Sequence, residues 1–321
     1  MARALLYHKY HVFWEEFLNG LGVEVIVSPQ TNKEIMGKGV NLSVDESCLS
    51  VKIYLGHVDY LKDKVDYLFM PRVATLYKKE EMCVKFLAIN DIVQNTFPGI
   101  KILDYTIDKN NFRHNFLGMM HVARKLKINY FTAIKSYFKA KKKYKESLIK
   151  KITAQQEIIK QGKNGPRILV VSHPYTTYDG FLGKPIIKFL ESQGVELIYS
   201  DAIESEEARM LSKNISSDLY WTYNKEFLGA IELYKDKIDG IIFLMVFPCG
   251  PDSLVINLCQ NKLKGLPMTV LILDELQGEA GLRTRLESFV DILKIRISKQ
   301  VNSPQINKSA TNITNSESDV S

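Results

Sequence analysis

Residues 167–199 read RILVVSHPYTTYDGFLGKPIIKFLESQGVELIY and decide the fold. Residues 167–172 are a short run rich in Ile, Leu and Val, residues 183–193 place apolar side chains at helical spacing, and residues 195–199 form a second strand-like run. A strand, a helix and a second strand at this spacing predict a βαβ unit, in which the two strands are parallel and joined by a right-handed crossover.

The same alternation continues in both directions along the chain. Downstream, the pattern predicts helices at 221–235, 252–262 and 284–296 and strands at 239–247 and 268–273. Upstream, it predicts strands at 3–7, 23–27, 65–70 and 100–103, and helices at 10–21, 31–38 and 49–61, with a further helix that follows a loop containing Cys83 and ends at about residue 95. We therefore predict an α/β protein with two Rossmann-like (flavodoxin-like) parallel-sheet lobes joined by a basic helical region.

The domain boundaries follow from changes in composition. The stretch QGKNGP at 161–166 is typical of a hinge or linker, and the last residues are rich in Asn, Ser and Thr without an aromatic side chain. We expect an N-terminal α/β lobe at 1–110, a basic helical connector at 111–163, a C-terminal α/β lobe at 164–296 and a disordered tail at 297–321.

The positive charge of the chain is concentrated in the connector. The net charge is +7, and residues 124–163 contain 13 Lys or Arg against two Glu. Apolar side chains at helical spacing predict a long helix or helix pair with an apolar stripe, namely Ile134, Tyr137, Phe138, Ile152 and Ile159. The basic face is either a solvated surface or a site for an anionic partner, such as the phosphates of a nucleotide-bearing thioester. No motif supports binding to nucleic acid.

The four cysteines have to be interpreted in the expected cellular compartment. The first residues lack the apolar core of a signal peptide, and no apolar run approaches the roughly 20 residues that cross a bilayer. We expect a soluble cytoplasmic protein without a membrane partner. Disulfides are rare in that compartment, which leaves buried thiols, metal ligands or redox groups as roles for the cysteines.

Three of the cysteines lie in loops where ligand-binding residues of doubly wound sheets occur. Cys83 follows a predicted strand, Cys249 lies two residues beyond another, and Cys48 precedes a predicted helix, whose free N–H groups favour a thiolate. Gly250 lets the chain pass close to a bulky group beside Cys249. Cys259 instead occupies a helical apolar pattern and is expected to fill the core.

The spacing of these cysteines does not decide between metals. The close Cys-X2-Cys pairs of structural zinc sites are missing, while iron-sulfur ligands can come from separate loops. No nucleophile elbow, phosphate loop or dinucleotide GxGxxG motif is present, which disfavours hydrolase and nicotinamide chemistry. His57 and His173 are interpreted as local hydrogen-bonding residues.

A charged loop follows the predicted strand at 268–273. Two readings of Asp274 and Glu275 stay open: they pair with Arg283 and Arg285 to fix the loop, or they hold a substrate, a cluster or a partner. Thr284 is predicted to cap the last helix as the first residue of a Thr-X-X-Glu capping box.

Five ordered motifs resemble one known group of proteins. They are ESCLSVKIYLGH at 46–57, FMPR at 69–72, CVKF at 83–86, FPCGPDS at 247–253, and DE at 274–275 followed by TRLESF at 284–289. Over roughly residues 2–295 the chain resembles activase-related proteins of the 2-hydroxyacyl-CoA dehydratase and benzoyl-CoA reductase superfamily, which includes double-cubane cluster proteins. One difference is that members usually carry Cys-Leu-Pro-X-Lys where this chain has Cys48-Leu-Ser-Val-Lys52.

The resemblance implies a function in anaerobic redox metabolism. By motif, Cys48, Cys83 and Cys249 would bind the iron of a 4Fe-4S or double-cubane cluster, whereas Cys259 matches no motif cysteine. An ATPase activase of the actin-like fold would reduce the cluster, and the low-potential electron would pass to an acyl-CoA in a dehydration or reduction. Residues expected near the cluster or the substrate are Lys52, His57, Arg72, Asp274, Glu275 and Arg285.

Several readings remain open at this point. Whether the chain is itself an enzyme is undecided, and a second copy or a related subunit is a further expected partner. The alternatives are a non-catalytic scaffold protein of such a system, or a two-lobed protein that closes over a small ligand.

Overall fold

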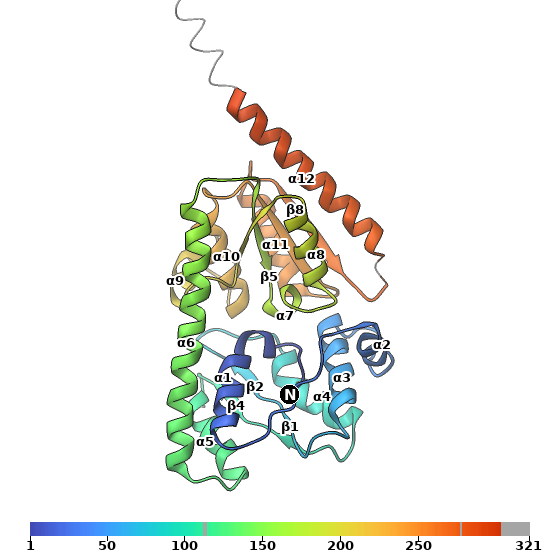
Figure 1. Cartoon of the computed structure of the whole chain (residues 1–321), viewed down its shortest axis with the longest axis vertical. Coiled ribbons are helices and arrows are strands. Elements are labelled where there is room, and N and C mark those ends of the chain that lie inside the picture. The colour runs from blue at the N-terminus through green and yellow to red at the C-terminus, as the bar shows by residue number, and fades with distance from the viewer. Residues whose placement is uncertain (112–113, 277, 303–321) are drawn as a thin grey trace, which may run out of the picture.

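The computed structural model describes residues 1–111, 114–276 and 278–302, and shows two α/β lobes stacked along one long helix (Figure 1). The C-terminal lobe contains a parallel four-stranded sheet, β6-β5-β7-β8. Its strands are β5 (Arg167–Ser172), β6 (Glu196–Tyr199), β7 (Gly240–Val246) and β8 (Met268–Leu273). The strand order reverses its direction between β5 and β7, which is the switch point where doubly wound sheets bind ligands.

β5 is buried on both faces because its side chains alternate between two cores. Ile168 and Val170 pack in one core with α8 (Gly183–Ser192) and α12 (Glu279–Asn302). Leu169 and Val171 pack in the other core with α10 (Thr222–Tyr234) and α11 (Gly250–Lys262). The sheet is therefore covered by helices on both faces, as the Rossmann-like prediction requires. Shorter helices complete the lobe: α7 (Pro174–Thr177), α9 (Ser205–Leu211) and the 3-10 helix η1 (Ser212–Asn214).

The N-terminal lobe has shorter strands than its partner. Parallel pairs form between β1 (Leu68–Phe69) and β3 (Ile102–Leu103), and between β2 (Arg72–Thr75) and β4 (Thr106–Asp108). Pro71 has no N–H to donate, so it interrupts the ladder between β1 and β2. The helices are α1 (Tyr7–Gly20), α2 (Lys33–Asn41), α3 (Leu49–Leu61) and α4 (Lys85–Thr96).

Two upstream strand predictions are wrong. Residues 3–7 do not form a strand, since α1 begins at Tyr7, and residues 23–27 belong to no helix or strand. Backbone bonds join this segment to its surroundings: Val23 N donates to Leu18 O at 3.2 Å, and the amino group of Met1 donates to Ile26 O. The apolar residues of this run favour a strand, but among the described residues no neighbouring strand forms a ladder of hydrogen bonds with it.

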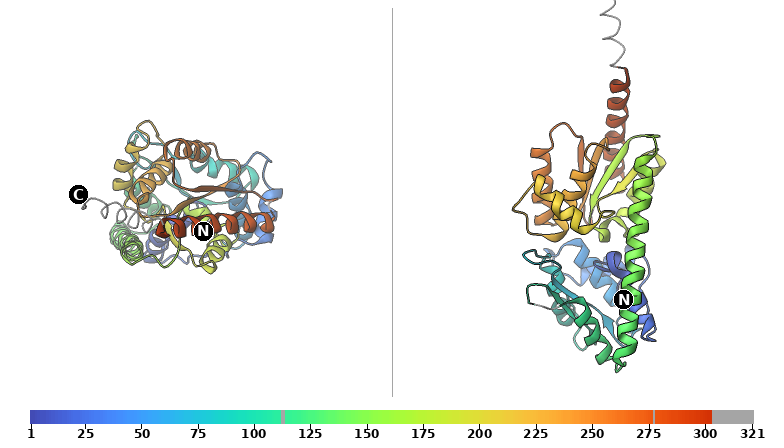
Figure 2. Two further views of the ribbon diagram at one scale, coloured as in Figure 1. Left: turned by 90° about the horizontal axis from the view of Figure 1, so that it is seen from above. Right: turned by 90° about the vertical axis from the view of Figure 1, so that its left-hand side faces the viewer.

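The connector contains α5 (Asn115–Lys125) and α6 (Tyr130–Lys160), and α6 runs beside both lobes (Figure 2). The predicted apolar stripe is only partly correct, because Ile134 and Phe138 are exposed. The buried face is made instead by Ala133, Ser136, Tyr137, Ala140 and Gln155. Small side chains let α1 pack closely against α6, so this face is less apolar than the sequence suggested. Among the helices of the described ranges, none is long and apolar enough to cross a membrane.

The last helix begins earlier than predicted. α12 starts at Glu279, and the Thr284 hydroxyl donates to Ala280 O at 3.1 Å, so Thr284 lies inside the helix and caps nothing. Residues 303–321, most of the predicted tail, lie outside the described residues.

We expect Gly39→Ala to destabilise the protein, because α2 crosses α3 at this residue. A Cβ atom on Gly39 would lie 1.9 Å from the carbonyl oxygen of Lys52, which is backbone and cannot rotate away. Overpacking of this kind costs about 2–3 kcal/mol, more than the helix propensity gained from Ala. Urea unfolding measures the change.

Gly37→Ala is the matched control in the same helix. Its Cβ would meet nothing within 4 Å, so the free energy of unfolding should stay the same or rise by up to about 1 kcal/mol. Equal behaviour of the two variants would contradict the close crossing of α2 and α3.

Candidate functional site

Cys48, Cys83 and Cys249 line one cavity at the interface of the two lobes. Its volume is about 150 Å³. Cys48 and Cys83 come from the N-terminal lobe and Cys249 from the C-terminal lobe, and each is partly buried. We call this space the cysteine cavity. Cys259 is fully buried in the core beside α10 and takes no part in it.

Each of the three thiols lies at the start of a helix. Cys48 is the N-cap residue of α3, Cys249 is the N-cap residue of α11, and Cys83 precedes the first residue of α4 by two positions. The first N–H groups of a helix have no partner within the helix, and the helix dipole is positive there. Three such ends at one cavity favour negative charge on whatever lies between them.

Backbone hydrogen bonds between the lobes hold these loops together. Leu49 N donates to Phe247 O at 3.0 Å, which joins the loop of Cys48 to that of Cys249. Near Cys83, Glu81 N donates to Tyr220 O and Thr222 N donates to Glu81 O, both at 3.0 Å. The position of the three thiols therefore depends on both lobes.

The wall of the cavity comes from the switch point of the C-terminal sheet. His173 and Tyr175 follow β5, and their rings stack with centroids 4.7 Å apart and an interplanar angle of 9°. Asp252 follows β7 on α11 and accepts hydrogen bonds from His173 Nε2 and Asn224 Nδ2, both at 3.0 Å. Aromatic rings thus shield a buried carboxylate that lies three residues beyond Cys249.

Burial keeps the thiols protonated when no cation is near. Burial raises the pKa of Cys48 and Cys83, and it raises the pKa of Cys249 most strongly, where the Asp252 carboxylate adds to the effect. Burial alone would raise the pKa of Asp252, but His173 and the hydrogen bonds from His173, Asn224 and Cys249 hold it below its usual range. A cationic group bound between the thiols would reverse this balance, since a coordinating thiol loses its proton.

Two buried polar atoms of cavity residues have no partner. The Ser50 hydroxyl and His173 Nδ1 form no hydrogen bond among the described residues. Buried polar groups are usually satisfied, so such atoms indicate a place for a ligand or an ordered water. In the part of the chain that the structure describes, no three His, Cys, Asp or Glu side chains gather around a single point as they would for one metal ion.

The other predicted site residues do not line the cysteine cavity. Lys52 is buried and forms an ion pair with Glu275 across the lobe interface, and Asp274 accepts a hydrogen bond from Leu276 N at 2.8 Å. Arg72 donates twice to Asp91, at 2.8 and 2.9 Å. These side chains connect structural elements around the site and do not reach into it.

The predicted pairing within the charged loop is wrong. Glu275 pairs with Lys52 and not with an arginine, Arg283 pairs with Glu287 at 3.1 Å, and Arg285 donates to Val270 O at 3.2 Å. The reason is tertiary: α3 of the other lobe brings a buried cation to Glu275, and the early start of α12 turns both arginines along the helix.

His57 and His173 do form hydrogen bonds, as predicted, but their partners are distant in sequence. His57 Nε2 lies 3.0 Å from the Thr31 hydroxyl, which donates to Asp179 of the other lobe. Burial lowers the pKa of His57 to about 3, and it raises the pKa of Asp179. This chain of polar groups crosses the lobe interface apart from the cysteine cavity.

The protein should lose stability on acidification because of His57. Its pKa is depressed from 6.5 to about 3 by burial, so the unfolded state takes up a proton first as the pH falls below 6.5. The contribution of neutral His57 to the free energy of unfolding is therefore fully present above pH 6.5. About 2 kcal/mol of it is lost between pH 7 and pH 5. Urea unfolding of wild type and His57→Gln at both pH values measures it, and an unchanged pH dependence in the variant would contradict the assignment.

Sequence reasoning missed most of the cavity wall. Asp252 stands inside the motif at 247–253, so its position beside Cys249 could have been noticed. Tyr175, Trp221, Tyr223 and Asn224 carry no sequence signal, because only the packing of α7 and α10 against the N-terminal lobe brings them to the cavity.

A comparison with protein families identifies a match over more than half of the chain. Residues 1–203 match the family model described as the CoA enzyme activase uncharacterised domain (DUF2229). This region includes Cys48 and Cys83, together with β5 and β6 of the C-terminal lobe. No protein of curated function matches the chain.

Proposed function

Since the chain belongs to the family of this CoA enzyme activase domain, we propose that it is an iron-sulfur protein that carries low-potential electrons in an activase-driven reaction of CoA thioesters. Family membership itself connects the chain with a CoA enzyme system. The cluster, the electron transfer and the identity of the partners are the proposal's own steps.

The convergence of Cys48, Cys83 and Cys249 on one cavity is the observation that carries this proposal. Thiolates are the protein ligands of 4Fe-4S and related clusters. A cluster takes each thiolate on a different iron atom, so its ligands stand around a space and need not meet at one point. The cysteine cavity also offers three helix starts and the unpartnered atoms of Ser50 and His173, so the residues present fit such a group.

In this function the three cysteines would hold the cluster, and the residues of the cavity wall would adjust its reduction potential. A bound cluster supplies one-electron transfer at low potential. Tyr175, Phe86 and Val246 line the same cavity as the thiols with apolar side-chain surface, and Asp252 keeps a negative charge beside Cys249. Apolar surroundings and nearby negative charge both disfavour the reduced form of a cluster, which is what a low reduction potential requires. Three thiolates leave one position open for sulfide, water, substrate or a second cluster.

Electrons and substrate would reach the site from the exposed rim of the cavity. Val84, which lines it, is 67% exposed, and Phe247 beside Cys249 is 55% exposed. Exposed apolar residues at the mouth of a site are typical of surfaces that bind another protein. We propose that an ATPase activase of the actin-like fold docks here, and that an acyl-CoA thioester accepts the electron.

Anaerobic purification followed by iron and acid-labile sulfide analysis tests this function. We expect brown protein with iron and sulfide in near-equal amounts, and a broad visible absorption that fades on reduction. Protein that stays colourless and free of iron after anaerobic reconstitution with iron and sulfide would overturn the proposal.

A further inference from the structure

A second cavity lies between α1, α6 and the carboxyl end of β6. Its volume is about 630 Å³, within the range of roughly 300–1,000 Å³ that is typical of small-molecule sites. We call it the basic cavity, because Arg3, His8, Lys9, His11, Lys151 and Lys184 line it. Among the described residues it has no lining residue in common with the cysteine cavity.

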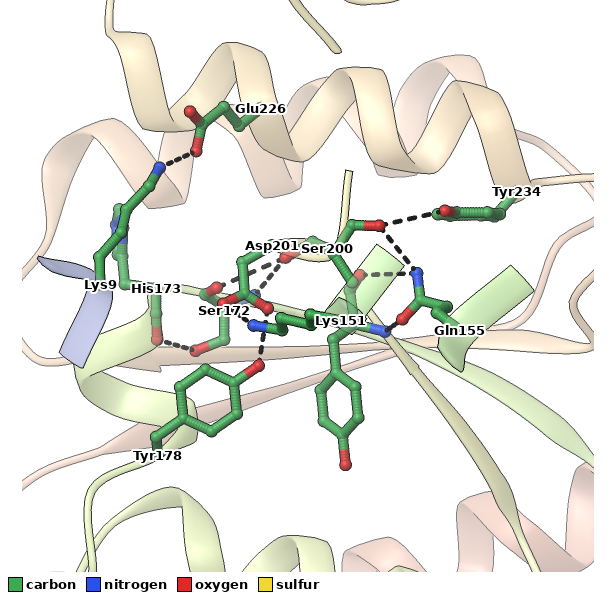
Figure 3. A network of polar contacts seen from close by, with 12 residues as sticks. Lys9, Lys151, Gln155, Ser172, His173, Tyr178, Ser200, Asp201, Glu226 and Tyr234 are labelled. Atoms are coloured by element: carbon green, nitrogen blue, oxygen red, sulfur yellow. Dashed lines mark hydrogen bonds and ion pairs between the residues drawn. The ribbon is translucent and has the colours of Figure 1, made fainter. Parts of the chain in front are cut away.

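Two of these cations are already neutralised within the protein. Figure 3 shows Lys9 pointing to Glu226, with which it forms an ion pair at 2.7 Å. The same view shows Lys151 and Tyr178 directed at Asp201: Lys151 forms an ion pair with it, and the Tyr178 hydroxyl donates to it at 2.8 Å. These contacts hold the cavity wall in place. Because Lys9 and Lys151 are paired with carboxylates, the net positive charge of the cavity comes from other residues.

Arg3 and Lys184 supply that charge. Arg3 Nε donates to Ser28 O at 3.0 Å, and Lys184 Nζ donates to Gln30 Oε1 at 3.1 Å. Within the described ranges neither residue forms an ion pair with a carboxylate, and Asp201 is the single acidic residue of the lining. The lining therefore carries more positive than negative charge.

His8 lies among these cations. Its pKa is lowered to about 4, mainly by burial, with smaller contributions from the nearby charges of His11, Arg3 and Lys184 that the hydrogen bond to Arg3 O partly offsets. An anion bound at this end would relieve the repulsion between these groups, and Arg and Lys side chains are the usual partners of phosphate.

The rest of the lining is mostly apolar or aromatic. It contains the rings of Tyr144, Tyr178 and Tyr199 and the side chains of Leu148 and Leu197. The rings of Tyr178 and Tyr199 have centroids 6.2 Å apart and are tilted by 47°. A planar ring fits against such a wall by offset or edge contacts.

We propose that the basic cavity binds a nucleotide, with its phosphate at Arg3 and Lys184 and its base ring against Tyr199 and the neighbouring apolar wall. The volume suits a mononucleotide, and the lining offers both cations for a phosphate and aromatic rings for a base. Two sources share this chemistry: a free nucleotide, or the nucleotide end of a larger cofactor such as coenzyme A. This inference does not depend on the cluster.

Calorimetric titration of the full chain with AMP tests the site. AMP should bind, while adenosine and inorganic phosphate, which each offer half of the contacts, should bind at least about tenfold more weakly. Lys184→Glu should weaken AMP binding by about tenfold or more. Lys188→Glu is the matched control, because Lys188 is exposed on the same helix one turn further on and does not line the cavity; it should change the affinity by less than about twofold.

A second pair of variants tests the volume without removing a charge. Ala154 is an exposed residue of the cavity lining on α6, so Ala154→Trp should fill the space and abolish AMP binding. Thr153→Trp, at the exposed neighbouring residue outside the lining, should leave binding intact. Coenzyme A that displaces AMP would identify the nucleotide end of a thioester as a source, and AMP binding that coenzyme A does not displace would identify free nucleotides.

The proposal is overturned if AMP does not bind at about 5 mM, or if AMP binds equally well to wild type, Lys184→Glu and Ala154→Trp. Iron and sulfide content should be the same in all of these variants. A failure here is therefore distinguishable from a failure of the proposed cluster.

Discussion

The Cys249→Ala protein should lose its cluster while keeping its fold. Cys249 is the only one of the three cavity cysteines that comes from the C-terminal lobe. Its removal leaves two thiols, both on the N-terminal lobe, so a cluster would no longer bridge the interface. We expect iron and acid-labile sulfide to fall at least about tenfold, together with the visible absorption.

Cys259→Ala provides the matched control on the same helix. Cys259 is fully buried in the core, so its truncation should cost about 1 kcal/mol of unfolding free energy without changing iron or sulfide. Equal iron content in the two variants would contradict the assignment of Cys249 as a ligand. Circular dichroism of both proteins shows whether the fold is retained.

Glu80→Ala should produce the largest loss of stability. Glu80 is buried at the lobe interface, where Oε1 accepts from Arg209 Nε at 2.6 Å and Lys225 Nζ at 3.1 Å, and Oε2 accepts from the Thr222 hydroxyl at 3.0 Å. Its removal leaves two cations and a hydroxyl without their acceptor. Breaking a buried ion pair costs about 3–5 kcal/mol, and partial exposure of the two cations favours the lower end, about 3 kcal/mol.

The same variant links stability to the site. Cys83 lies three residues beyond Glu80, so cluster content should fall along with the free energy of unfolding measured by urea. Glu287→Ala is the control, because its pair with Arg283 is exposed and is worth no more than about 0.5 kcal/mol. A loss below about 1 kcal/mol for Glu80→Ala would show that this interface does not hold the lobes together.

Sequence patterns predicted the C-terminal lobe almost completely. The strands at 167–172 and 268–273 have the predicted bounds, because each is a continuous run of mostly apolar residues. The helix at 49–61 of the N-terminal lobe also has the predicted bounds. The strands of the N-terminal lobe were harder to predict from the sequence. Leu68–Phe69 and Ile102–Leu103 are so short that a few tertiary hydrogen bonds decide their extent.

The site could be predicted only as far as loop chemistry allows. Loop context singled out Cys249 and placed Cys259 in the core, and family motifs added Cys48 and Cys83. The pairing of Lys52 with Glu275 could not be predicted, because it depends on how one lobe packs on the other. The basic cavity was missed for the same reason: Arg3, Lys184 and Tyr199 are far apart in sequence and meet only after α1, α8 and β6 are assembled.

The central claim is that the three cysteines at the lobe interface bind one redox-active cluster. The most direct measurement is an electron paramagnetic resonance spectrum of the anaerobically reconstituted protein after reduction with dithionite. The account predicts a signal of a reduced iron-sulfur cluster in wild type and Cys259→Ala that is absent from Cys249→Ala. A spectrum without any cluster signal in iron-free wild-type protein, or an identical signal in Cys249→Ala, would contradict it.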